Sequence, residues 1–150
     1  MRFSGKVFKD GDYWLAEIPI LDIMTQGHTE EESYNMALDA IISLINKEDF
    51  KIDLYKGKKG NFEVSSLDSK SMISLLLQRK RENSGLSLAQ VAARLGFTSR
   101  NSYARYERGQ SMPTLGKLDE LLRAVDPSMD FVINDSNALT RVCTGQRKLC

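Results

Sequence analysis

The chain has 150 residues, of which 41% are apolar and 27% are charged, and its formal net charge at neutral pH is +1. This composition is ordinary for a folded globular protein and excludes both global disorder and a fibrous repeat. No apolar run approaches the roughly 18 residues that a membrane-spanning helix needs, and no targeting pattern opens the sequence, so we expect a cytoplasmic protein without a membrane partner.

The charges are divided unevenly along the chain. Residues 1–66 hold 8 lysines and arginines against 12 aspartates and glutamates, a net charge of −4. Residues 67–126 hold 10 basic against 6 acidic residues, a net charge of +4. This asymmetry favours two binding partners of opposite charge, although solvated surface charge is the commoner cause of such a division.

Strand patterns come first along the chain. Apolar residues alternate with a period of two on both sides of Lys9, Asp10, Gly11 and Asp12, which predicts a hairpin. Further strands are expected after this hairpin and after the first helix. The predicted strands cover residues 2–8, 13–19, 22–26, 50–57 and 61–66.

One helix interrupts these strands. Thr29 and Glu32 have the spacing of a capping box, which predicts a helix start at residue 30 and a helix that runs to about residue 46. One apolar stripe is expected on this helix, formed by Tyr34, Ala37, Ile41, Leu44 and Ile45. The first 66 residues are therefore predicted to form a small antiparallel sheet with one packed helix, and the protein to have the α+β class.

The second part of the chain has the pattern of short helices separated by turn residues. Gly85, Gly96 and Gly109 each close a predicted helical segment, as expected for helix ends, and Ser87 with Gln90 forms a second capping box. Residues 129–133 are a candidate for one more strand. The predicted helices cover residues 69–85, 88–95, 99–108 and 114–125, and leucines 115, 118, 121 and 122 should form the inner face of the last.

Two short helices joined by a tight turn predict a helix-turn-helix, which places its second helix in the major groove of DNA. Arginine suits the guanine edge and asparagine suits the adenine edge. Of the two tyrosines on the second helix, Tyr103 and Tyr106, we expect one to be packed and one to be half-exposed. The candidate DNA-binding residues are Ser99, Arg100, Asn101, Ser102, Arg105 and Tyr106, within a contact region at residues 86–110.

This segment resembles the XRE, or lambda-repressor-like, helix-turn-helix family. The matching residues are Ala92, Gly96, Tyr106, Glu107, Gly109, Pro113 and Leu118. The resemblance implies that the helix from Ser99 to Tyr106 reads a palindromic operator and that the protein binds it as a homodimer or higher homo-oligomer. The sequence departs from the family at Leu88, where glutamine is common, and in a turn that is one residue longer than usual.

Residues 1–66 resemble the HicB antitoxin family, in a strand that ends at Pro19, the run Thr25-Gln26-Gly27 and the glutamates before the helix. The resemblance implies a partial RNase H-like fold, a small basic HicA-type mRNA-cleaving toxin as the partner, and repression of the protein's own operon. A toxin that binds mRNA must be basic, which agrees with the acidic charge of this segment.

We therefore expect a toxin-neutralising domain at residues 1–66, a DNA-binding domain at residues 67–136, and a structureless tail at residues 137–150. The alternative is a stand-alone phage-type repressor whose first domain dimerises or senses a ligand.

We expect no enzyme activity, cofactor or metal. A nuclease would need converging carboxylates, whereas Asp10 and Asp12 flank a turn and Glu30–Glu32 crowd one helical turn. His28 is expected to be an exposed loop residue, and Cys143 and Cys150 have too few neighbouring ligands for a zinc site.

Overall fold

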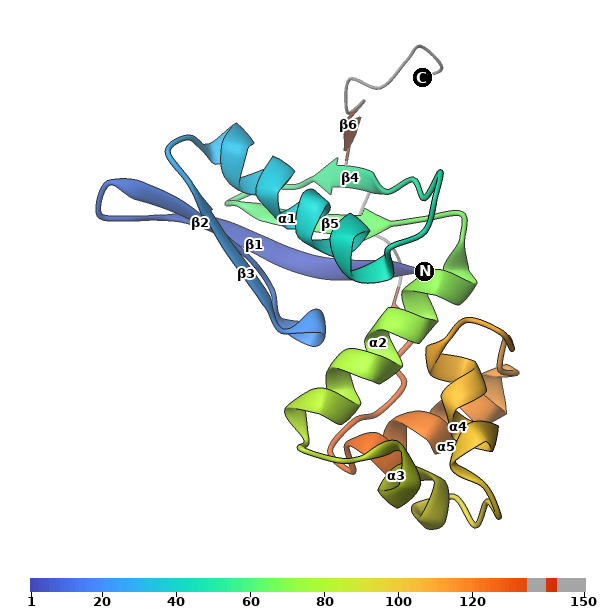
Figure 1. Cartoon of the computed structure of the whole chain (residues 1–150). Coiled ribbons are helices and arrows are strands. Elements are labelled where there is room, and N and C mark those ends of the chain that lie inside the picture. The colour runs from blue at the N-terminus through green and yellow to red at the C-terminus, as the bar shows by residue number, and fades with distance from the viewer. Residues whose placement is uncertain (135–139, 143–150) are drawn as a thin grey trace. The chain divides into compact units, whose positions relative to one another are not determined.

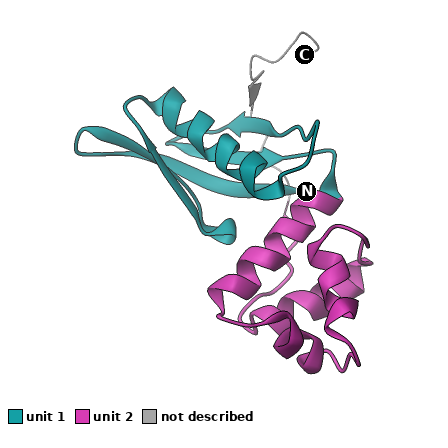
Figure 2. Cartoon of the chain, in the orientation of Figure 1, with its two compact units in different colours: residues 1–69, 135–150 teal, residues 70–134 magenta. Residues whose placement is uncertain are grey.

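The computed structural model of the protein describes residues 1–134 and 140–142. The chain forms two compact units, residues 1–69 with 135–150 and residues 70–134, which we name the sheet unit and the helical unit (Figure 2). Each unit has its own buried apolar core. The α+β class expected from the sequence is confirmed, with an antiparallel sheet and one helix followed by a helical bundle.

The sheet unit has the strand order β3-β2-β1-β5-β4-β6, and every neighbouring pair is antiparallel. Helix α1 lies across one face of this sheet (Figure 1). A 3-10 turn at Pro19–Leu21 separates the second and third strands. The elements are β1 (Arg2–Asp10), β2 (Tyr13–Ile18), β3 (Ile23–Gly27), α1 (Glu30–Ile45), β4 (Asp53–Lys56), β5 (Asn61–Ser65) and β6 (Thr140–Val142).

The predicted hairpin is confirmed. Asp10 pairs with Tyr13 at its closed end, and the two-residue loop between them has Gly11 at a φ of +57°. Hairpin loops of two residues need a positive φ at the first central position, and glycine reaches it without steric cost.

The buried side of α1 differs in part from the expected stripe. Tyr34, Ala37 and Ile41 are buried, but Leu44 is 42% exposed, and Leu38 is buried in its place. Counted from Ser33, the buried residues of α1 follow the spacing i, i+1, i+4, i+5, i+8. The buried stripe therefore lies nearer the start of the helix than predicted. The Tyr34 ring packs edge-on against Phe62 of β5, with ring centroids 5.2 Å apart.

The cap of α1 also differs in one contact. The Thr29 hydroxyl accepts a hydrogen bond from the Glu32 amide, as predicted. The Glu32 carboxylate accepts from the His28 amide at 2.7 Å instead of from the Thr29 amide. The second hydrogen bond of the capping box is therefore made to the residue before the N-cap, His28, and not to the N-cap itself.

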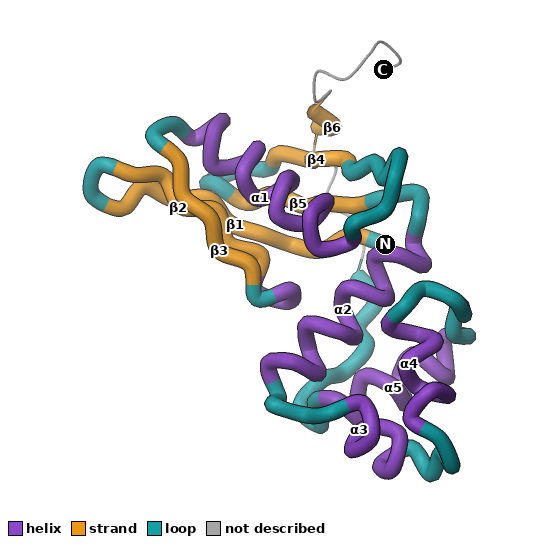
Figure 3. The backbone as a smooth tube through the Cα atoms, viewed as in Figure 1, coloured by secondary structure: helices purple, strands orange, loops and turns teal. Residues whose placement is uncertain are grey.

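The helical unit consists of four helices, drawn in purple in Figure 3. They are α2 (Ser69–Asn83), α3 (Leu88–Arg94), α4 (Arg100–Glu107) and α5 (Leu115–Val125). Their core includes Leu77, Val91, Tyr103 and Leu121. On α5 three of the four predicted leucines are buried, whereas Leu115 is 58% exposed because it is the first residue of the helix and begins outside the bundle core.

The end of the chain departs from the sequence expectations. Residues 129–133 form no strand, and the segment after α5 is loop as far as residue 134 (Figure 3). A strand forms instead at Thr140–Val142, within the tail that was expected to lack structure, and it pairs with β4. The other residues of that tail, including Cys143 and Cys150, lie outside the described residues.

Candidate nucleic-acid interface

The turn between α3 and α4 is built by backbone geometry at Gly96. The Gly96 amide donates to the carbonyl of Ala93 at 3.0 Å, and the Phe97 amide donates to the carbonyl of Ala92 at 2.9 Å. Gly96 has a φ of +69°. This pair of bonds is the Schellman arrangement, which ends a helix and turns the chain sharply.

The same arrangement ends α2 at Gly85 and α4 at Gly109, where the amides of Leu86 and Gln110 complete the paired bonds. The starts of α3, α4 and α5 are capped by the hydroxyls of Ser87, Ser99 and Thr114. Ser87 and Gln90 form the predicted capping box of α3, with both reciprocal bonds present. The directions of α3 and α4 are therefore set by caps and left-handed glycines.

Helix α4 presents most of the predicted DNA-binding residues along one arc. At 100° per residue, Asn101, Ser102, Arg105 and Tyr106 occupy adjacent directions on the side away from the buried Tyr103 and Ala104. Asn101 and Arg105 are exposed, and Ser102 and Tyr106 are half-buried. The expectation of one packed and one half-exposed tyrosine is thus confirmed.

The other two predicted residues lie at the start of α4. Arg100 is exposed because it occupies the first helical position, about a quarter-turn away from Asn101. Ser99 is the N-cap, and its hydroxyl accepts from the Asn101 amide at 3.2 Å. Ser99 therefore already has a structural role that places the first turn of α4.

Three exposed arginines of this region have no counterion among the described residues. Within residues 1–134, Arg100, Arg105 and Arg108 make no side-chain hydrogen bond or ion pair. Sequence reasoning missed Arg108, although its spacing of three from Arg105 could have indicated it. The side chains of α4 therefore present positive charge that phosphates or base edges can satisfy.

An ion pair holds the end of α4 to α2. Arg81 Nε donates to Glu107 Oε1 at 2.7 Å, Arg81 Nη2 donates to Glu107 Oε2 at 2.9 Å, and Nη1 donates to the Leu86 carbonyl. The Glu107 side chain is 7% exposed. The carboxylate raises the pKa of Arg81 through these bonds. Arg81 is therefore a structural residue.

Tyr103 is buried in the core of the helical unit, near this ion pair. Its ring is fully buried, and its hydroxyl makes no hydrogen bond within the described residues. Burial raises the pKa of Tyr103, and repulsion from the Glu107 carboxylate raises it further. The Tyr103 phenol therefore loses its proton less readily in the folded protein than in the unfolded chain.

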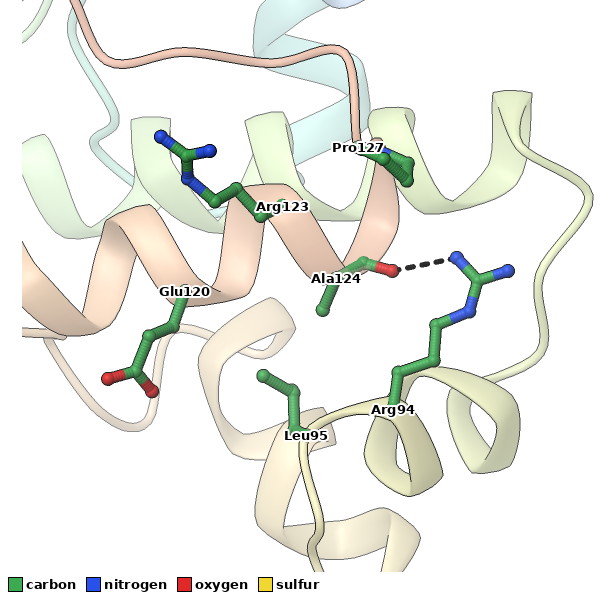
Figure 4. Close-up of a pocket in the computed structure, with 6 residues that line it drawn as sticks. All are labelled: Arg94, Leu95, Glu120, Arg123, Ala124 and Pro127. Atoms are coloured by element: carbon green, nitrogen blue, oxygen red, sulfur yellow. Dashed lines mark hydrogen bonds between the residues drawn. The ribbon is translucent and has the colours of Figure 1, made fainter.

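A shallow pocket lies between α3 and α5 and is lined by two arginines (Figure 4). Arg94 donates from Nη1 to the Ala124 carbonyl at 2.9 Å, which satisfies the end of α5. Arg123 pairs with Asp119 and Asp130. Both arginines therefore have partners within the fold. Among the residues that the structure describes, no group of side chains could hold a metal ion.

Residues 77–131 match the family model described as helix-turn-helix. The match begins in α2 and runs past the end of α5, so it includes the capped α3-turn-α4 segment and the Arg81–Glu107 pair. Fold and match together define a DNA-binding helix-turn-helix domain, the class found in transcription regulators. No curated protein matches the chain. Among the described residues, no helix has both the length and the apolar character needed to cross a membrane.

Proposed function

We propose that the protein is an antitoxin that binds a small basic HicA-type toxin through residues 1–66 and represses its own operon through residues 67–136. The DNA-binding part of this proposal rests on the arc of α4. There the side chains of Asn101 and Arg105 are exposed and point in neighbouring directions. Arginine and asparagine are the side chains that read guanine and adenine edges most directly.

In this proposal Ser99, Arg100, Asn101, Ser102, Arg105 and Tyr106 form the DNA contact. Asn101 and Arg105 read base edges, while Arg100 and the hydroxyls bind the phosphates that flank them. Each α4 reads one half-site, so the protein acts as a homodimer or a higher homo-oligomer. Two half-sites are then about 34 Å apart, or a multiple of that distance.

The toxin-binding half is supported by charge. Residues 1–66 have a net charge of −4 and form the sheet with its single covering helix. An mRNA-cleaving partner has to bind phosphates and is therefore basic, so electrostatic attraction speeds its capture. The resemblance of this segment to the HicB family supports the same partner.

Growth of cells that express the small reading frame adjacent to this gene tests the proposal. The full chain and residues 1–66 alone should both rescue growth, and the full chain should shift a DNA fragment that contains the operon's own promoter. A DNA shift without any rescue would contradict the antitoxin role and leave a stand-alone repressor, whose first domain dimerises or senses a ligand. Absence of the DNA shift would contradict autoregulation.

A further inference from the structure

Helix α1 has an unusual distribution of charge and apolar surface. Its sixteen residues include Glu30, Glu31, Glu32 and Asp39 but no lysine, arginine or histidine. Large apolar side chains are also exposed on it, since Met36 is 46% exposed and Ile42 is 37% exposed. Solvent-facing sides of helices are normally polar, and exposed apolar groups that lie together with a polar rim mark binding surfaces.

These residues share one side of the helix. At 100° per residue, Glu32 and Asp39 lie opposite the buried Tyr34 and Ile41, while Met36 and Ile42 flank Asp39 on its two sides. We name Glu32, Met36, Asp39 and Ile42 the outer strip of α1. The strip faces away from the sheet, which packs against the other side of the helix (Figure 1).

The two carboxylates of the outer strip have no cation within the described residues. The Asp39 carboxylate makes no hydrogen bond or ion pair there, and the Glu32 carboxylate accepts a bond from a backbone amide alone. The neighbouring carboxylates are different, because Glu31 pairs with Lys56 and Glu30 accepts a hydrogen bond from Tyr34. The negative charge on the strip is therefore available to a partner.

We infer that the outer strip of α1 is the surface that contacts the basic partner, an inference that rests on the proposed function. A protein that binds RNA phosphates presents lysines and arginines, which would pair with Glu32 and Asp39. Contact would also bury Met36 and Ile42, and a partly apolar centre with a charged surround is the usual composition of a protein interface.

On the opposite face of the sheet, the carboxylate of Glu63 is already neutralised. Glu63 bonds to Arg2, and the Arg2 guanidinium also stacks on Tyr55 at 3.7 Å from the ring centroid. A cation from a partner would have to replace Arg2 at Glu63. At the outer strip it would neutralise a charge that has no counterion of its own within residues 1–134.

Two matched pairs of variants of the full chain test the inference. Asp39→Lys and Met36→Ser alter the outer strip, and Asp10→Lys and Met24→Ser make the same changes at exposed positions of β1 and β3 that alternate onto the other face of the sheet. The probe is the purified small protein encoded by the adjacent reading frame. Its dissociation constant is measured for each variant, and circular dichroism and promoter binding verify that each variant is folded.

Asp39→Lys should weaken binding of this probe at least about tenfold and lose its growth rescue, and Met36→Ser should weaken it less. The control variants should bind as the native chain does. Equal binding by all four variants would overturn the inference and leave the proposed function standing. A change of the chain's own oligomeric state in Asp39→Lys, with the probe bound normally, would assign the strip to a second copy. No binding by the native chain would contradict the proposed function itself.

Discussion

Arg81 and Glu107 are joined by two parallel hydrogen bonds of 2.7 and 2.9 Å, although 26 residues separate them in the sequence. Arg81 lies near the end of α2 and Glu107 is the last residue of α4. Because the guanidinium also binds the Leu86 carbonyl, one side chain connects two helices and the turn that leads to α3. Planar, bidentate pairing of this kind fixes direction as well as distance.

Removing one partner of this pair should be costly. Glu107→Gln leaves the largely buried Arg81 guanidinium without its counterion, and we expect a loss of about 3 kcal/mol in the free energy of unfolding of the helical unit. Chemical denaturation measures this loss. Glu120→Gln is the control, because Glu120 pairs with Lys117 but its side chain is 61% exposed, and an exposed pair contributes about 0.5 kcal/mol. Equal losses in the two variants would contradict the structural role of the pair.

Arg105→Ala should affect DNA binding without affecting stability. The Arg105 side chain is exposed and has no hydrogen-bond partner within residues 1–134, so its truncation leaves the fold intact. Loss of a bidentate base contact costs about 1–3 kcal/mol, so operator affinity should fall about tenfold or more and base preference should relax at one position. Fluorescence anisotropy with single-base operator variants provides the measurement, and Arg123→Ala on α5 is the control. Unchanged preference would remove Arg105 from base reading.

The two glycines Gly96 and Gly116 should respond in opposite ways to alanine. Both have open space where a Cβ would lie, but Gly96 has a φ of +69° and Gly116 lies in the first turn of α5. Gly96→Ala should destabilise the protein by about 1 kcal/mol, because alanine is strained in the left-handed region. Gly116→Ala should stabilise it by about 0.5 kcal/mol through helix propensity. Thermal unfolding of both variants tests the sign of each change in stability. Shifts of the two melting temperatures in the same direction would contradict the prediction.

Stability should fall steeply at alkaline pH. Burial raises the pKa of both Tyr34 and Tyr103, and the Glu30 and Glu107 carboxylates raise these values further. A tyrosine whose pKa is raised by folding contributes stability below its unfolded pKa of about 10, and this contribution is lost as the pH rises above that value. Each buried tyrosine should add about 1.4 kcal/mol per pH unit to the slope. Urea denaturation between pH 9 and 12 measures this slope, and Tyr103→Phe should reduce it; an unchanged slope would contradict the prediction.

The sequence predicted helices, caps and the hairpin well because these depend on neighbouring residues. Thr29, Ser87, Gly85 and Gly96 each act through bonds to residues within five positions in the chain. The strand at Thr140–Val142 was missed because its formation depends on β4, more than 80 residues earlier, and three residues carry no periodic pattern.

The difference between contacts with sequence neighbours and contacts with distant residues also explains which parts of the candidate site could be predicted. Exposure of Asn101 and Arg105 follows from helical spacing, which a sequence displays directly. The roles of Arg81 and Arg94 could not be read from spacing, because the groups they bind, Glu107 and the Ala124 carbonyl, lie 26 and 30 residues further along the chain. A run such as Arg79-Lys80-Arg81 gives no indication of which guanidinium turns inward.

The glycine turns on either side of α4 have an evolutionary consequence. Backbone bonds at Gly96 end α3 and set the turn before α4, those at Gly109 end α4, and both sets are indifferent to the side chains on the exposed arc of α4. Asn101 and Arg105 can therefore be exchanged for other residues while the helix keeps its place. A lineage of such proteins could acquire new operators through a few substitutions, since the frame that holds the helix would need no compensating change.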